Sequence, residues 1–159
     1  MPAIADALQA VEFDRKTVVV GPDAESRSWV RDLAGRLGVD HAVAHKTRRN
    51  DRAVEVWLAD PNLFAARPVL LVDDIVSSGG TLIACAKALV AAGATSIDVI
   101  ITHALFPAEL AGELSRVGIR SIRSTHSVPH PTNAIVLDDL FMVALRDEMG
   151  RTVPLERKP

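Results

Sequence analysis

Two adjacent acids and a stretch of small hydroxyl and glycine residues are the part of this sequence best suited to chemistry. Asp73 and Asp74 follow the apolar run Pro68–Val72, and two apolar residues separate them from Ser77-Ser78-Gly79-Gly80-Thr81. Glycines let backbone N–H groups approach an anion, and a helix starting there adds its positive end. The pattern indicates a sugar-phosphate site, with carboxylates for hydroxyls and amides for phosphate. The alternative is a capped strand-to-helix turn beside two solvated acids.

The elements around this stretch predict an α/β fold. The apolar run suits a strand buried on both faces, and Leu82–Ala92 has a helical pattern without Gly or Pro. Strand and helix patterns alternate along the chain, so we expect a three-layer fold, a mostly parallel central sheet with helices on both faces. Further strands are expected at 16–21, 41–45, 53–58, 96–104, 119–124 and 134–136, and further helices near 26–37, 107–116 and 140–148. Acids at the carboxyl end of a strand then stand where such folds keep their ligand crevice.

Composition narrows the class of protein. The chain has 159 residues, enough for one domain, and is 48% hydrophobic without any Tyr. Its formal net charge of −2 gives no general attraction for nucleic acid, so an anion site has to be local. The single cysteine, Cys85, excludes an intramolecular disulfide, and no apolar run is long enough to cross a bilayer. We expect a cytoplasmic protein that binds neither nucleic acid nor membrane.

A second acidic position follows the first expected strand. Asp23 comes just after Val20-Gly21-Pro22, so it should lie at the same edge of the sheet as Asp73 and Asp74. A carboxylate near a phosphate site suits Mg²⁺, which bridges phosphates and keeps several waters. The residue types equally suit a simple cap of the following helix. The sequence leaves both interpretations open.

A cationic stretch begins at Lys46. The sequence Lys46–Arg52 is polar and basic, without an apolar anchor, and we expect an exposed, mobile loop. Lys46 and Arg48 could neutralise the charge that develops during phosphoryl transfer. Taken alone, such a stretch is more often a solvated basic loop.

Together these three stretches, Val18–Asp23, His45–Arg49 and Leu70–Thr81, resemble the C-terminal half of ribose-phosphate pyrophosphokinases, which have the type I phosphoribosyltransferase fold. The likeness runs from about Lys16 to Leu145. It implies that Lys46 and Arg48 form a catalytic K-x-R element and that Asp23 contributes to binding Mg²⁺. It also implies a pyrophosphate loop made of Pro22, Asp23, Ala24 and Glu25, ribose hydroxyls held by Asp73 and Asp74, and a 5-phosphate held by Ser77, Ser78, Gly79, Gly80 and Thr81.

The resemblance implies transfer of the β,γ-diphosphoryl group of ATP to O1 of ribose 5-phosphate, giving phosphoribosyl diphosphate (PRPP) and AMP. We expect a linker helix at 1–14, the phosphoribosyltransferase-like domain at 15–150 and a loose tail at 151–159. Two departures from the family stand out. Glu25-Ser26 replace the usual glycines of the pyrophosphate loop, and the family's N-terminal domain, which supplies most adenine contacts, has no counterpart here. A homo-oligomer or a partner chain would then complete the ATP site.

Two other functions fit the same motifs. A stand-alone phosphoribosyltransferase would use PRPP on a nucleobase and needs a hood over it, for which Trp57, Phe106, Phe141 and the 125–133 loop are candidates. A non-catalytic, regulatory protein that binds PRPP or ribose phosphate is favoured by the missing half and by Glu25-Ser26. A metal site at His126 and His130 is disfavoured, because Pro129 and Pro131 oppose a helix there. His103 is expected to be a hydrogen-bonded core residue.

Overall fold

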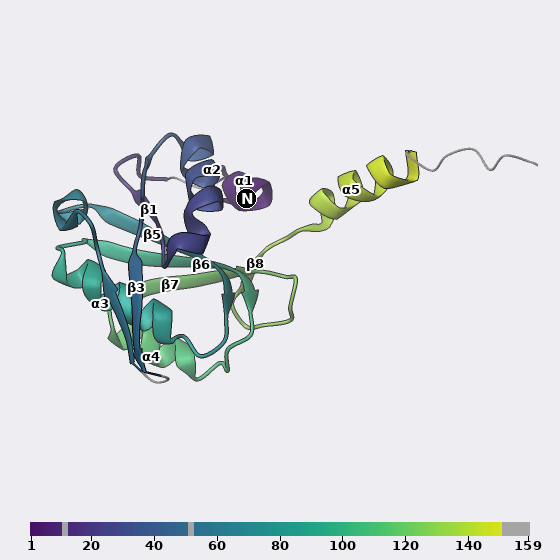
Figure 1. Ribbon diagram of the computed structural model, residues 1–159. Helices are drawn as coiled ribbons and strands as arrows, with labels where there is room; N and C mark the ends of the chain where they lie inside the picture. The colour runs from purple at the N-terminus through teal and green to yellow at the C-terminus, as the bar shows by residue number, and fades with distance from the viewer. Residues whose placement is uncertain (11–12, 51–52, 151–159) are drawn as a thin grey trace, which may run out of the picture.

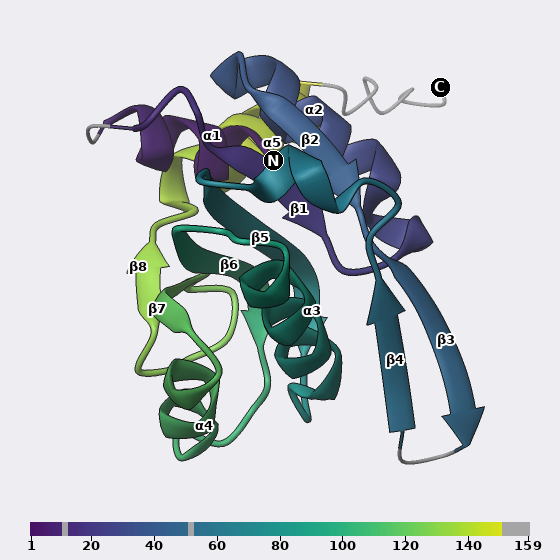
Figure 2. The same ribbon diagram turned by 90° about the vertical axis from the view of Figure 1, so that its left-hand side faces the viewer.

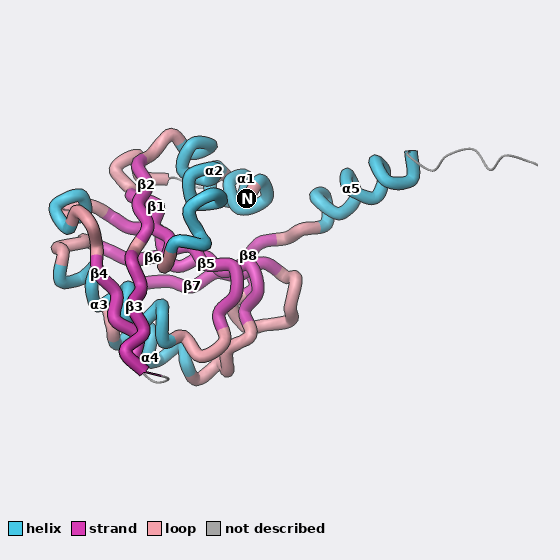
Figure 3. The backbone as a smooth tube through the Cα atoms, in the orientation of Figure 1, coloured by secondary structure: helices cyan, strands magenta, loops and turns pink. Residues whose placement is uncertain are grey.

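The main sheet is parallel throughout and carries helices on both faces (Figures 1 and 3). The computed structural model describes residues 1–10, 13–50 and 53–150, with the backbone alone for residues 48–50, 53 and 54. Within these ranges, six strands pair in the order β2-β1-β5-β6-β7-β8. They are β1 (Val18–Gly21), β2 (Asp40–Val43), β5 (Pro68–Val76), β6 (Ser96–Ala104), β7 (Ile119–Thr125) and β8 (Asn133–Ile135).

The described helices are α1 (Pro2–Gln9), α2 (Arg27–Leu37), α3 (Gly80–Ala91), α4 (Leu110–Arg116) and α5 (Asp138–Gly150), with 3₁₀ turns η1 (Ala24–Ser26) and η2 (Pro61–Phe64). Side chains alternate along a strand, so β5 serves two hydrophobic cores. Val69 and Leu71 pack with Leu82 and Leu89 of α3, whereas Leu70 and Val72 belong to a second core. That second core contains buried residues of α1 and α2, so the expected three-layer α/β fold is confirmed.

Helix α1 is built into this second core. Ile4, Ala5 and Leu8 are buried in it, together with Val30 and Leu33 of α2. The amphipathic pattern of 2–9 therefore contributes to the stability of the domain, whereas the linker role expected for 1–14 stays a prediction. The expected tail at 151–159 lies outside the described residues.

The basic stretch is a β-strand, which corrects the expectation of a mobile loop. β3 (His45–Asn50) pairs antiparallel with β4 (Ala53–Trp57) to form a hairpin beside α3 (Figure 2). Residues 51–52 of the expected loop lie outside the described ones. Backbone hydrogen bonds to β4 stabilise β3 whatever its side chains are, and Val56 and Leu58 anchor the hairpin on the first core.

Among the boundaries that differ from expectation, those of β5, β2 and α4 bear on the site. β5 continues past Val72 to Val76 because β6 runs beside it, with Val76 opposite Ala104. Asp73 and Asp74 therefore lie within the strand. β2 ends at Val43, and His45 begins the hairpin. α4 begins at Leu110, since residues from Pro107 first form a turn in which the Leu110 amide donates to the Pro107 carbonyl at 3.0 Å.

Helix α5 projects away from the sheet and its two helical layers (Figure 1). None of the residues described in it is buried, although several are large and apolar: Phe141 is 52% exposed and Leu145 57%. Its first turn is acidic, as suits a helix N-terminus. No helix among the described residues has the length and apolar character that crossing a membrane requires.

The buried position of Leu8 and the exposed position of Leu145 predict different effects of the same substitution on stability. Leu8→Ala should lower the free energy of unfolding by about 2–5 kcal/mol, because it opens a cavity in the second core. Leu145→Ala should change it by less than about 0.5 kcal/mol, because the side chain is exposed. Urea unfolding of dilute samples measures both. Equal losses in the two variants would contradict the placement of α5.

Candidate functional site

The expected site residues meet at the carboxyl edge of the sheet. β1 and β5 are parallel neighbours, with Val18 opposite Val69 and Val20 opposite Leu71. The segments that follow these two strands therefore leave the sheet side by side. The hairpin β3–β4 reaches the same edge, since the amide of Ala44, which precedes it, donates to the carbonyl of Gly21 at 2.8 Å.

The glycine-rich stretch forms the N-terminus of α3. Gly79 is the residue before the helix and has a φ of +72°, a conformation that favours glycine. A Cβ there would also lie 2.4 Å from Leu110 Cδ2. The segment encloses a hollow of about 70 Å³, lined by Asp73 and by residues 75–82. Its size and free helical amides suit a phosphate group.

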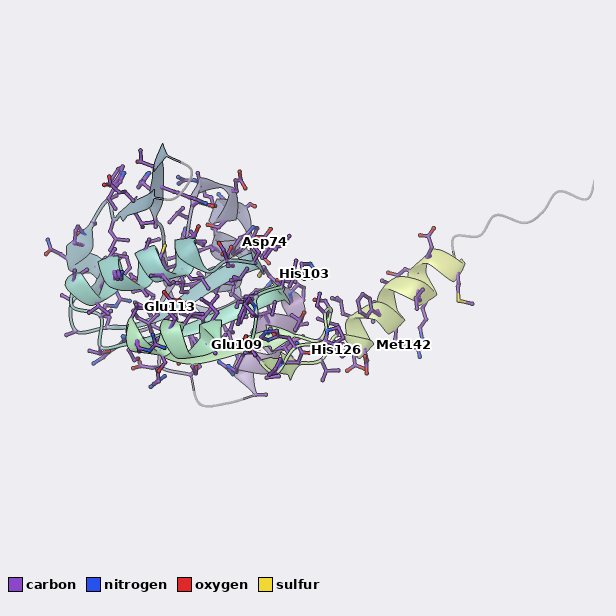
Figure 4. All side chains as sticks on the ribbon, turned by 90° about the horizontal axis from the view of Figure 1, so that it is seen from below. Asp74, His103, Glu109, Glu113, His126 and Met142 are labelled. Atoms are coloured by element: carbon purple, nitrogen blue, oxygen red, sulfur yellow. The ribbon has the colours of Figure 1, made fainter. Side chains whose placement is uncertain are left out.

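The two acids differ in environment. Successive residues of a strand face opposite sides, so Asp73 faces the side of Leu71 and α3, while Asp74 faces the other side and is exposed. Burial raises the pKa of Asp73 to about 7, helped by the charges of Asp74 and Asp23 and opposed by an amide hydrogen bond and by Lys46. Near neutral pH, Asp73 is thus divided between its neutral and ionised forms. On the neighbouring strand β6, His103 pairs with Ile75, the residue after Asp74 (Figure 4).

Asp23 caps a 3₁₀ turn, as one of the two interpretations expected. Its carboxylate accepts a hydrogen bond from the amide of Glu25 at 3.2 Å. The turn packs closely on β1, because a Cβ at Gly21 would lie 1.9 Å from Ser26 Oγ. Lys46 Nζ lies 3.7 Å from Asp23 Oδ2, and both side chains are half-buried. The first residue of the basic stretch is therefore held against the first acidic loop.

Cys85 lies behind this cluster and is not a candidate nucleophile. It is buried, and its thiol is 3.8 Å from the carbonyl of Pro22. Burial raises the pKa of the thiol to about 12, with help from the negative charges of Asp73 and Asp23. A thiol in this environment stays protonated and unreactive.

A second, larger hollow adjoins the Asp23 loop. It measures about 620 Å³ and is lined by Asp23, Ala24, Glu25, His45, Lys46, Thr47 and Trp57. The rings of His45 and Trp57 are stacked, with centroids 3.9 Å apart and planes 10° apart. From the sequence, Trp57 is expected as a candidate hood residue and His45 as the first residue of the basic stretch, without a contact between them. The sequence signal that could have predicted this stack is the symmetric placement of the two residues about the hairpin turn, which makes them cross-strand partners.

The structure thus brings together Asp73, the 77–81 loop, the 22–25 loop and Lys46. The backbone of Arg48 lies in β3, opposite Val54, and its side chain is outside the described part of the chain. The histidines that were set aside have protein partners. His103 Nδ1 is 2.8 Å from Ser127 Oγ, His126 Nε2 is 2.9 Å from Asp138 Oδ1, and His130 Nε2 is 3.0 Å from the Phe106 carbonyl.

Comparison with known proteins decides the family. The family model described as phosphoribosyl transferase domain matches residues 3–138. This chain belongs to the phosphoribosyltransferase family. The fold, the parallel β1–β5 edge and the strand–DD–SSGGT–helix stretch are therefore those of a phosphoribosyltransferase domain.

Several curated relatives of this chain are named ribose-phosphate pyrophosphokinase. The ribose-phosphate pyrophosphokinase of Methanopyrus kandleri is 35% identical over 114 residues, which cover 72% of this chain and 39% of the relative. That of Streptomyces coelicolor is 30% identical over 154 residues, covering 96% of this chain and 47% of the relative. The resemblance to ribose-phosphate pyrophosphokinases that the sequence motifs indicated is confirmed. The chain spans less than half the length of each of these relatives.

Solved structures show the same fold. The phosphoribosylpyrophosphate synthetase of Mycobacterium smegmatis superposes with a TM-score of 0.74 at 22% identity, over 92% of this chain and 49% of that one. An adenine phosphoribosyltransferase (APRTase) from Giardia lamblia gives a TM-score of 0.56 at 20% identity, over 78% and 79% of the two chains. The type I phosphoribosyltransferase-like architecture expected from the sequence is confirmed.

The environment of Asp73 predicts a stability difference that depends on pH. Its carboxyl is protonated in both the folded and the unfolded chain below about pH 3, but above about pH 7 the folded chain has the cost of a buried charge. Asp73→Asn removes that cost, so the free energy of unfolding of the variant should exceed that of the parent by on the order of 3 kcal/mol at about pH 8 and match it at about pH 3. Urea unfolding across this pH range measures the difference. Asp147→Asn, on the exposed helix α5, is the control and should show no such trend.

Gly79 and Gly80 should respond differently to the same substitution. Gly79→Ala should cost about 2–4 kcal/mol of stability, because it combines a positive φ with a contact on Leu110. Gly80→Ala should be neutral or stabilise by up to about 1 kcal/mol, since the nearest atom to its new Cβ is Ser78 Oγ at 3.9 Å and alanine favours a helix. Thermal unfolding of the pair gives the comparison, and a stable Gly79→Ala would contradict the loop conformation.

Proposed function

We propose that this chain carries the ribose-5-phosphate half of an enzyme that makes PRPP from ribose 5-phosphate and ATP. One observation carries the proposal: Lys46 lies against Asp23 at the same edge of the sheet as Asp73 and the 77–81 loop. A sugar-phosphate loop alone would suit any protein that binds PRPP. A lysine held beside it is what transfer of a phosphoryl group additionally requires.

The residues divide by chemistry. The hollow at 77–81 receives the 5-phosphate through backbone amides and the hydroxyls of Ser77, Ser78 and Thr81. Asp73 and Asp74 accept hydrogen bonds from the ribose hydroxyls. Because Asp73 lies near Lys46 and Asp23, a ribose held there directs its O1 toward the second hollow.

The reaction is a displacement at the β-phosphorus of ATP. O1 of ribose 5-phosphate forms a bond to that phosphorus, the bond to the bridging oxygen of the α-phosphate breaks, and AMP leaves while the O1 proton is released. Lys46, and Arg48 as the second member of the K-x-R element, stabilise the charge on the transferring group. Such transfers depend mainly on positioning and electrostatics, so no general base is assigned.

Magnesium fits the donors at this edge. Among the described residues, no three His, Cys, Asp or Glu side chains form a group that could hold a metal ion by themselves. Mg²⁺ commonly uses one or two carboxylates together with substrate phosphates and water. Asp23 is the carboxylate that would hold it, and the ion would neutralise the diphosphate beside Lys46.

Assembly is part of the proposal. Helix α5 exposes Phe141, Met142, Val143 and Leu145 to solvent, a surface that association would bury (Figure 4). We propose that a second copy or a partner chain covers it and completes the ATP site. The cytoplasmic location expected from the sequence stays a prediction.

A phosphorus NMR time course with ribose 5-phosphate, ATP and Mg²⁺ tests the function. PRPP and AMP should appear, and Lys46→Ala should slow their formation by about 10³-fold because it removes charge stabilisation. Lys87→Ala, on the exposed side of α3, is the matched control and should keep the parent rate.

Measuring ribose 5-phosphate binding separates the catalytic role proposed for Lys46 from the binding role proposed for Asp74. Lys46→Ala should bind it as the parent does, whereas Asp74→Ala should bind it about tenfold more weakly, since a carboxylate that accepts hydroxyl bonds is lost. Calorimetric titration measures both. A folded parent that binds PRPP without forming it, alone or with candidate partner chains, would favour the non-catalytic binder. PRPP consumption with a free nucleobase would favour the stand-alone phosphoribosyltransferase.

A further inference from the structure

A hollow at the opposite edge of the sheet has no part in the reaction proposed above. It measures about 440 Å³ and lies at the amino ends of β5, β6 and β7, beside the last turn of α1. The strands are parallel, so Asp73 and the 77–81 loop are at their other ends. The volume is within the range of about 300–1,000 Å³ found for small-molecule sites. The hollow is therefore large enough for a ligand of its own.

A β-bulge places Arg120 on the wall of this hollow. The pairing of β6 with β7 shifts between Ile97 and Asp98, which leaves Arg120 as an extra residue in β7. Arg120 Nε donates to Asp98 Oδ1 at 3.0 Å, Arg120 Nη2 donates to Oδ2, and Ser121 Oγ donates to Oδ1 at 2.5 Å. Burial alone would raise the pKa of Asp98, but these bonds and the charges of Arg120 and Arg123 hold it below its usual value. Arg120 and Asp98 thus neutralise each other.

Arg123 is the cation of the hollow that lacks such a partner. It pairs with Ile100, so its side chain leaves the sheet on the face of the second core, in which Ile100 is buried. Arg123 is itself half-buried, and its guanidinium has no hydrogen bond or ion pair to any residue that the structure describes. A guanidinium carries five N–H donors and keeps its charge in proteins. These donors must be satisfied from the open side of the hollow, by water or by a ligand.

The charges on the wall indicate a ligand with a single negative charge. Lys16, Arg120 and Arg123 are the cations there, and Asp14 and Asp98 are the acids. The carboxylate of Asp14 accepts a hydrogen bond from the backbone amide of Lys16 at 2.8 Å and forms no ion pair with a described cation. Three cations against two acids leave one positive charge unmatched, which a monoanion balances and a dianion exceeds. A carboxylate has this charge and matches the planar fork of a guanidinium.

The hollow also has an apolar side, formed by Leu8, Phe13 and residues 68–70. An inorganic anion would leave this surface in contact with water, whereas a hydrocarbon body would cover it. We propose that the hollow binds a small organic acid as its monoanion, with the carboxylate on the Arg123 guanidinium and the hydrocarbon body against Leu8 and Phe13. The inference is independent of the proposed function, because it uses none of the residues assigned to the reaction.

Hexanoate is a suitable probe, and calorimetric titration measures its binding. It should bind saturably with millimolar affinity, as suits a ligand of so few atoms. Acetate lacks the hydrocarbon body and hexanol lacks the charge, so each should bind at least tenfold more weakly. Hexyl phosphate, as a dianion, should also bind more weakly than hexanoate. Amide chemical shifts in NMR spectra should change at residues 95–98 and 120–123 and stay constant at the 77–81 loop.

Substitution of Arg123 tests the contact with the carboxylate. Arg123→Met removes the charge and keeps an unbranched side chain, and it should weaken hexanoate binding by about ten- to a hundredfold. Its unfolding midpoint without ligand should equal or exceed that of the parent, because a half-buried charge without a protein acceptor is removed. Arg123→Lys keeps the charge without the fork and should retain part of the affinity. Arg31→Met, at an exposed position of α2, is the matched control and should bind as the parent does.

Several results would overturn the inference. Equal hexanoate affinity in the parent and in Arg123→Met would exclude the guanidinium contact, and equal affinity for hexanoate and acetate would exclude the apolar one. Shift changes confined to the exposed apolar residues of α5 would indicate non-specific binding of the hydrocarbon. A lowered unfolding midpoint in Arg123→Met would mean that the fold itself uses the guanidinium, so that the hollow has no unmatched charge to offer.

Discussion

Parallel pairing of β1 with β5 crowds carboxylates at one edge of the sheet, and the candidate site depends on that crowding. The pairing of Val20 with Leu71 brings the loop of Asp23 next to Asp73. Little of the charge is compensated, since Lys46 is the cation that acts on Asp73 from within the described residues, against Asp74 and Asp23. Groups that repel one another in a partly dehydrated position destabilise the free protein. The buried valines and leucines of both strands offset that cost.

The same arrangement bears on the sugar-phosphate ligand proposed above. Hydroxyl donors or a divalent cation would replace the water that Asp73 has lost, and the first amides of α3 have no partner inside the helix. Binding of a hydroxyl-rich, phosphate-bearing ligand would therefore relieve an unfavourable interaction and satisfy unpaired donors at the same time.

Local sequence patterns were sufficient to predict much of the fold. The strand 68–72, the loop 77–81 and the helix behind it are contiguous, so composition and periodicity identify them, and parallel topology then predicts that Asp23 and Asp73 share an edge. The strand β3 was not predicted, because its backbone hydrogen bonds to β4 stabilise it and its own polar residues do not indicate a strand. Val56 and Leu58 anchor β4, and only pairing with β4 makes a strand of a sequence as polar as His45–Asn50. The different environments of Asp73 and Asp74 depend on burial, which adjacent identical residues cannot reveal.

The hairpin joins the domain through neighbouring points, because His45 at its start faces Trp57 at its end. The six strands of the main sheet pair without it. Because both ends of the hairpin meet at this one pair, a change in the length of the hairpin beyond it would leave the strands of the main sheet and the 77–81 loop in place.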